Sequence, residues 1–116
     1  MTKTLANLQF WPFLLFCTYL SLTPAPPRIV ESFSDKLLHT AGYLALYLSA
    51  SLVWPRLRHR LPKLELLLAY SILIEILQHF IPHRGFSLLD ILANATGLLL
   101  GVIFFDLLWQ RVFRRG

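Results

Sequence analysis

The chain has 116 residues, of which 56% are hydrophobic and only 15% are charged. Because soluble domains carry about 25% charged residues, this composition excludes an ordinary soluble domain and indicates a membrane protein. The many large apolar side chains exclude a disordered chain, and the single cysteine, Cys17, excludes a disulfide scaffold.

Four apolar stretches divide the chain, and each is long enough to cross a bilayer as a helix, which takes about 20 residues. We therefore predict an all-α membrane protein in which residues 1–116 form one domain, a four-transmembrane-helix bundle with helices over about 5–22, 36–55, 64–81 and 90–109. The first helix must end at the prolines after Thr23, because proline lacks a backbone donor and clashes with the preceding turn. A cleaved signal peptide is the competing interpretation of the first stretch, since Lys3 precedes an apolar run.

Positive charges fall mainly on one side of the predicted bundle. Of the eleven Lys and Arg residues, only Arg28, Lys36 and Arg84 fall on the side opposite the termini. Because positive charge near short loops is retained in the cytoplasm, we expect both termini to be cytoplasmic. We interpret the basic run 56–60 as a determinant of topology and of contact with anionic membrane lipids, not as a nucleic-acid patch. The basic residues expected on the cytoplasmic side are Lys3, Arg56, Arg58, Arg60, Lys63, Arg111, Arg114 and Arg115.

Polar side chains recur at the outward end of three predicted helices. An ionisable group at the centre of a membrane helix costs about 3 kcal/mol on insertion scales, so such residues usually mark a site. On the second helix, Asp35 and His39 are four residues apart and share a face. On the third helix, Glu75 is the deepest acid of the outer half, and on the fourth helix Asp90 and Asn94 share a face.

These positions predict an outward-facing polar pocket. In this pocket Lys36 and Arg84 offset the three carboxylates, while Gln78 and Asn94 complete the hydrogen bonding. We expect the pocket to bind a ligand through Asp35, Lys36, His39, Glu75, Gln78, Arg84, Asp90 and Asn94.

Each of these residues also has a structural interpretation. Asp35 and Asp90 lie where they can cap the second and fourth helices, and Glu75 can pair with Arg84 to hold helices together. His39 can hydrogen-bond Asp35 or Glu75 as a structural contact, and Arg84 can anchor to lipid phosphate. The functional interpretation makes Glu75 and His39 the candidates for catalysis.

Other chemistries have weaker support. His39 and His79 lie near Glu75 in the predicted bundle, but no spaced ligand motif of the zincin kind is present, so we expect no metal site. Neither a phosphate-cradling glycine loop nor a dinucleotide fingerprint occurs, so we expect no cofactor. Gly97 and Gly101 form a small face for helix packing, either within one chain or between chains.

The polar positions together resemble a known family. The segment 34–101 is similar to the VanZ-like family of small bacterial membrane proteins, although Pro82-His83-Arg84 stands where the family commonly has Pro-Gly-Arg. The resemblance is carried by Ser34-Asp35-Lys36-Leu37-Leu38-His39, then Tyr43, then Glu75-x-x-Gln78-x-Phe80-x-Pro82-x-Arg84-x-x-Ser87-x-x-Asp90-x-x-Ala93-Asn94-x-x-Gly97-x-x-x-Gly101.

The resemblance implies a multi-pass protein of the bacterial cytoplasmic (inner) membrane, and a role at the cell envelope. The namesake of the family is associated with teicoplanin resistance, but no general reaction accompanies the family. We therefore expect a pocket that binds or influences an anionic, lipid-linked envelope component, with an effect on glycopeptide susceptibility. Two alternatives stay open: a membrane-embedded hydrolase or transferase acting on a lipid-linked substrate, and a small assembly or scaffold protein.

Overall fold

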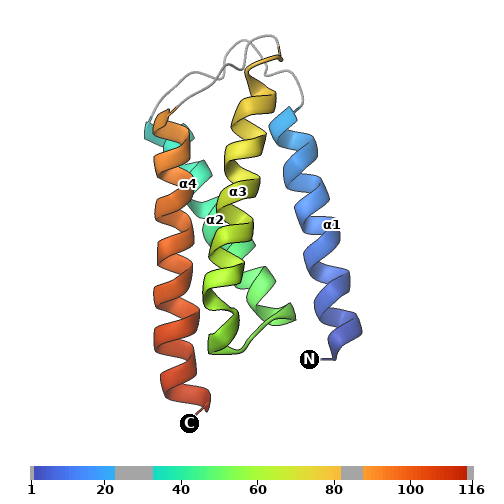
Figure 1. Ribbon diagram of the computed structural model, residues 1–116, viewed down its shortest axis with the longest axis vertical. Coiled ribbons are helices and arrows are strands. Elements are labelled where there is room, and N and C mark those ends of the chain that lie inside the picture. Colours follow the sequence, from blue (N-terminus) through green and yellow to red (C-terminus); the bar gives the residue numbers. More distant parts are fainter. Residues whose placement is uncertain (1, 23–32, 82–87, 115–116) are drawn as a thin grey trace.

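The computed structural model describes residues 2–22, 33–81 and 88–114. In these ranges every regular element is helical and there is no strand, which confirms the all-α prediction. Figure 1 shows the helices side by side, with both ends of the chain at the same end of the bundle. The elements are α1 (Lys3–Leu22), α2 (Phe33–Val53), the 3-10 helix η1 (Leu57–His59), α3 (Arg60–Gln78), α4 (Leu88–Gly101) and the π-helix η2 (Val102–Arg114), which continues α4.

The helix ends differ from the predicted ones for local reasons. The helix α1 begins at Lys3 because the Thr2 hydroxyl accepts a hydrogen bond from the Leu5 amide at 3.2 Å and so caps the first turn. The helix α2 ends at Val53, since Pro55 cannot continue it. The lengths of the apolar stretches predicted where the four helices lie, but not the polar turns at the helix ends.

Two segments are long and apolar enough to cross a membrane, namely Lys3–Leu22 and Leu88–Leu108. The helices α2 and α3 have 21 and 19 residues, which is also enough to span, but they carry more polar and charged side chains. The four-crossing bundle therefore stays a prediction for α2 and α3.

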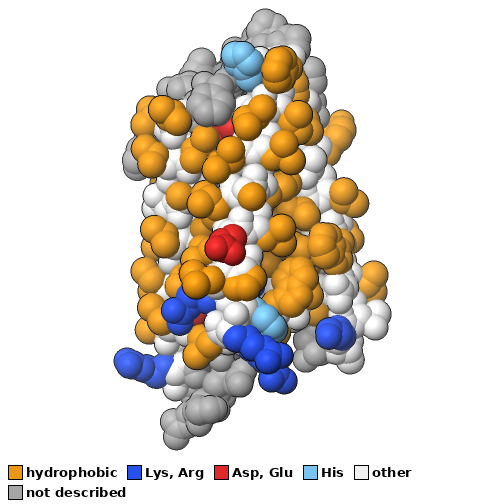
Figure 2. Space-filling model, viewed as in Figure 1, with side chains coloured by type: hydrophobic (Ala, Val, Ile, Leu, Met, Phe, Trp, Pro, Cys, Tyr) orange, Lys and Arg blue, Asp and Glu red, His pale blue; other side chains and the backbone are white. Residues whose placement is uncertain are grey.

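The surface of the bundle is predominantly apolar. Figure 2 shows hydrophobic side chains over most of the visible face, with Lys and Arg gathered at the end that holds the chain termini. Such a continuous apolar surface far exceeds the patches of a few hundred Å² found on soluble monomers. Together with the two candidate spans, it indicates a membrane protein. The largest exposed fractions include those of Leu8, Leu15, Tyr19, Leu38 and Leu92.

The closest helix contact lies between α2 and α4, where glycine replaces a side chain. A Cβ atom added at Gly97 would meet the backbone oxygen of Thr40 and lie 2.9 Å from the Leu44 nitrogen. A Cβ atom added at Gly101 would lie 2.7 Å from the Tyr47 Cβ atom. Both glycines therefore pack against α2 of the same chain.

The helix α1 is attached to the rest of the bundle by a few contacts. Phe10 is fully buried and meets the Trp54 ring edge-on, with 5.7 Å between ring centroids. Further along α1, the Thr18 and Tyr70 hydroxyls share a hydrogen bond of 2.6 Å. The outer surface of α1 is exposed, as expected for a helix that faces lipid.

We predict that Gly97→Ala lowers the free energy of unfolding by about 1–3 kcal/mol, because the added methyl group meets backbone atoms that cannot move aside. The measurement is SDS-induced unfolding in mixed micelles, followed by circular dichroism. Gly42→Ala is the matched control: a Cβ atom there has nothing within 4 Å, so stability should not fall. Equal stability of Gly97→Ala and the original chain would contradict the close contact.

Candidate functional site

Polar side chains from three helices meet at the end of the bundle where α2 and α4 begin. We call these residues the Asp90 cluster: Lys36 and His39 from α2, Ser71 from α3, and Asp90 and Asn94 from α4. Lys36 and His39 are three residues apart, and Asp90 and Asn94 are four apart, so each pair shares a helix face. The contact between α2 and α4 brings the two faces together.

An ion pair joins the two helices at the rim of the cluster. The Lys36 Nζ atom donates a hydrogen bond to Asp90 Oδ1 at 2.5 Å. The side chains of Lys36 and Asp90 are 21% and 11% exposed, so the pair lies at the edge of the packed interior. The sequence analysis expected Lys36 to offset a carboxylate, and the structure pairs it with Asp90.

The orientation of His39 follows from its two neighbours on α4. Asn94 donates from Nδ2 to the Ser71 hydroxyl oxygen at 2.7 Å, so its carbonyl oxygen faces His39 Nδ1, 3.0 Å away. Because a carbonyl oxygen only accepts, Nδ1 carries a proton. The other ring nitrogen, Nε2, faces the Asp90 carboxylate, 3.6 Å from Oδ2.

The floor of the cluster is fully buried. Ser71 and Glu75 are both 0% exposed and lie one turn apart on α3, and Asn94 is 1% exposed. Glu75 is therefore a carboxyl group removed from water, one turn nearer the outward end of α3 than Ser71.

The remaining predicted site residues are placed differently. Gln78 is buried, but its amide nitrogen donates to the Ser21 carbonyl of α1 at 2.8 Å and so ties α3 to α1. Asp35 lies on α2, but its side chain falls outside the described part of the chain. Arg84 also lies outside the described residues.

The arrangement can perform two kinds of chemistry. Lys36 presents a charged donor to an anion at the rim. At His39, Nε2 is the ring nitrogen that can take up or release a proton, because Asn94 holds Nδ1.

We predict that Asn94→Leu lowers the free energy of unfolding by about 2 kcal/mol, because it removes the partner of the buried Ser71 hydroxyl and of His39 Nδ1. The same SDS titration measures this loss. Thr96→Val is the control on α4, since the exposed Thr96 hydroxyl bonds only to Leu92 of its own helix. If Asn94→Leu lowers the free energy of unfolding no more than Thr96→Val does, the hydrogen bonds of Asn94 do not stabilise the packing of the helices.

A second polar group lies at the opposite end of the bundle and was missed by the sequence analysis. We call it the Asp106 cluster: Tyr47, Ser51, Arg60, Lys63 and Asp106. Asp106 is 2% exposed and accepts a hydrogen bond from the Tyr47 hydroxyl. Its Oδ1 atom lies 3.5 Å from Lys63 Nζ, and its Oδ2 atom lies 3.8 Å from Arg60 Nε. Lys63 is also 2% exposed and donates to the Ser51 hydroxyl oxygen at 2.7 Å.

One sequence signal could have found this cluster. Asp106 is an isolated acid in the apolar run 98–109, and an acid in such a run needs a partner. Its partner Lys63 was counted among the cytoplasmic charges, because charge near a helix end is usually solvated. The packing of α3 against η2 buries Lys63 instead, above the rings of Tyr47 and Phe105 at 4.5 and 5.2 Å.

We predict that Asp106→Leu lowers the free energy of unfolding by about 3–5 kcal/mol, since it leaves Lys63 buried without its carboxylate. The double variant Lys63→Met, Asp106→Leu should recover much of the loss, because both charges are then absent. Glu65→Gln on the exposed face of α3 is the control and should change stability little. A double variant as unstable as Asp106→Leu would contradict the pairing.

The comparison with known proteins agrees with the polar pattern. The family described as VanZ/LLP1 matches residues 7–109, which include both polar clusters. No curated protein and no solved structure matches the chain. Since the family match covers most of the sequence, the chain belongs to the VanZ/LLP1 family.

Proposed function

We propose that the chain is a multi-pass protein of the bacterial cytoplasmic membrane, with all four helices crossing the bilayer and both termini in the cytoplasm. The position of both chain ends at one end of the bundle supports this topology. The exposed basic residues at the same end support it as well, because positive charge is retained on the cytoplasmic side. Among the described residues these include Lys3, Arg56, Arg58 and Arg111.

In this topology the Asp90 cluster lies near the outer leaflet, and we propose that it binds an anionic headgroup of a lipid-linked envelope component. One observation carries the proposal: Lys36 and His39, each 21% exposed at the side chain, face the same carboxylate, Asp90. An incoming phosphate can accept a charge-assisted hydrogen bond from the Lys36 ammonium, whereas at His39 it would have to replace Asp90 at Nε2, because Asn94 occupies Nδ1. Arg84, predicted to lie at the same level, would add another donor.

The family supports an envelope component as the ligand and membrane lipids as the surroundings. A protein that binds such a component in the outer leaflet can change the access of glycopeptides to it. An effect on glycopeptide susceptibility is therefore part of the proposal.

We predict that geranyl monophosphate binds to the full chain in phosphatidylcholine nanodiscs, whereas geraniol, which has the same chain without the phosphate, binds at least about tenfold more weakly. Lys36→Gln should reduce the affinity for the phosphate by about tenfold, because it removes one charge-assisted hydrogen bond. Isothermal titration calorimetry measures both affinities.

Arg58→Gln is the matched control, because Arg58 is exposed at the opposite end of the bundle. Its affinity should equal that of the original chain. Equal affinities for geraniol and geranyl monophosphate would contradict the proposed site. An equal loss of affinity for geranyl monophosphate in Lys36→Gln and Arg58→Gln would contradict it as well. In cells, Lys36→Gln should change teicoplanin susceptibility at unchanged protein abundance.

A second function is favoured by the fixed orientation of His39. In this function Asn94 keeps the proton on Nδ1, so Nε2 of a neutral His39 is the nitrogen that would take a proton from water as a general base. In the same nanodiscs, phosphate release from geranyl monophosphate that is lost in His39→Gln but kept in His79→Gln would identify a hydrolase. His79 is the control because it is exposed and stacks edge-on with Phe80.

A further inference from the structure

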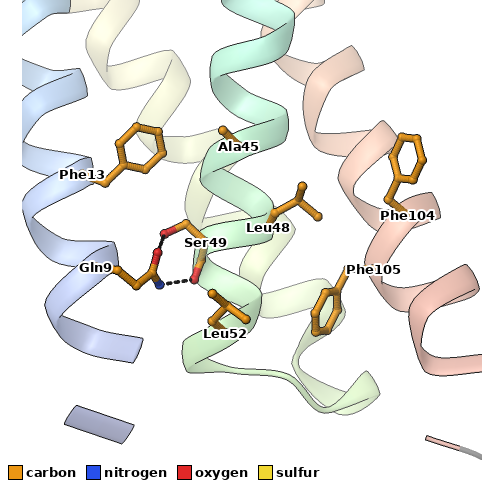
Figure 3. Close-up of a pocket in the computed structure, with 8 residues that line it drawn as sticks. All are labelled: Gln9, Phe13, Ala45, Leu48, Ser49, Leu52, Phe104 and Phe105. Atoms are coloured by element: carbon orange, nitrogen blue, oxygen red, sulfur yellow. Dashed lines mark hydrogen bonds between the residues drawn. The ribbon is translucent and has the colours of Figure 1, made fainter. Parts of the chain in front are cut away.

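An apolar groove of about 590 Å³ opens on the side of the bundle between α1, α2 and η2. Figure 3 shows that its walls come from all three helices and that the ring of Phe105 lies at the side of η2 that faces α2. The groove lies in the half of the bundle that holds the termini, away from the Asp90 cluster. Its apolar lining consists of Phe13, Ala45, Leu48, Leu52, Phe104 and Phe105.

The polar side chains in the groove are satisfied by each other. Gln9 donates from Nε2 to the Ser49 carbonyl at 2.8 Å, and the Ser49 hydroxyl donates to Gln9 Oε1 at 2.5 Å (Figure 3). Gln9 also donates to the Ala6 carbonyl of its own helix at 2.9 Å. These bonds leave a surface suited to hydrocarbon, not to a polar ligand.

Basic residues gather at the end of the bundle that holds the termini, the end nearer the groove. Leu52 lies four residues before Arg56, and Gln9 lies about 9 Å beyond Lys3 by helical rise. The groove residue Phe105 is in contact with the Lys63 ammonium, which is 5.2 Å from the ring centroid.

This charge is not balanced by acids. Asp106 is occupied by the buried Lys63 and by Arg60, and Glu65 is the other described acid on this half of α3 and η2. The exposed cations that remain at this end of the described chain are Lys3, Arg56, Arg58 and Arg111.

We propose that the groove holds one acyl chain of an anionic phospholipid from the leaflet on the side of the termini, with its phosphate at Lys3 and Arg56. The apolar walls fit the chain, and the excess of cations at the end of the groove fits a negative headgroup and not a zwitterionic one. This site differs from the proposed headgroup site at the Asp90 cluster in position, leaflet and residues.

The experiment is native mass spectrometry of the full chain released from vesicles of equal parts phosphatidylglycerol and phosphatidylcholine. We expect one retained lipid per chain, with phosphatidylglycerol favoured by about fivefold for each basic residue engaged. Equal retention of the two lipids by the original chain would overturn the proposal without reference to any variant.

Two variants separate the acyl chain from the headgroup. Ala45→Phe fills the groove and should abolish the retained lipid, whereas Ala69→Phe, on the exposed face of α3, should not. Arg56→Gln should keep the lipid but lower the preference for phosphatidylglycerol by about fivefold. Retention by Ala45→Phe at the original level, in a sample whose helicity is unchanged, would overturn the proposal.

The same assay separates this site from the Asp90 cluster. His79→Gln should leave the retention of phosphatidylglycerol unchanged, because His79 is exposed at the opposite end of the bundle and outside both proposed sites. A loss of retention in Lys36→Gln would place the lipid at the Asp90 cluster and overturn the groove assignment. A failure of geranyl monophosphate to bind would contradict the proposed function and leave the groove unaffected.

Discussion

At Gly97 the helices α2 and α4 approach so closely that one added carbon would meet the backbone of Thr40. This contact sets the rotation and height of the two helices relative to each other. At one end it places Lys36 and His39 opposite Asp90 and Asn94. At the other end, the contact of Gly101 with Tyr47 brings the tyrosine hydroxyl to Asp106. Both polar clusters therefore depend on two positions that lack a side chain.

Charged side chains inside this apolar bundle are stabilised by partners from other helices. Lys36 pairs with Asp90, and Lys63 with Asp106, so each carboxylate has a cation from a different helix. Since a charge without a partner in a low-dielectric interior is costly, these pairs also act against alternative helix arrangements. The two pairs differ in access: Lys36 is partly exposed at the rim, whereas Lys63 is enclosed by aromatic rings. This difference is the reason for proposing a ligand at the Asp90 cluster and a structural role for the Asp106 cluster.

The two ends of the bundle suit different lipid contacts. At the Asp90 end, polar side chains point toward one another, and the proposed ligand would meet them through its headgroup. At the opposite end, the groove between α1, α2 and η2 is apolar and the charges lie at its border. The packing of Gly97 and Gly101 within the chain also argues against a scaffold that uses this face to bind another protein.

The sequence by itself determined the all-helical class, the position of the four helices and the family, because apolar length and motif spacing are local properties of the chain. It also determined that Asp35 shares a helix face with His39 and that Asp90 shares one with Asn94, since helical periodicity sets that relation. Only the tertiary structure decided which faces meet: His39 is bonded to Asn94 and faces Asp90, Gln78 reaches α1, and Lys63 is buried against Asp106. The physical reason is that periodicity leaves the rotation and the neighbours of each helix open, and these are set by close packing between residues far apart in the chain.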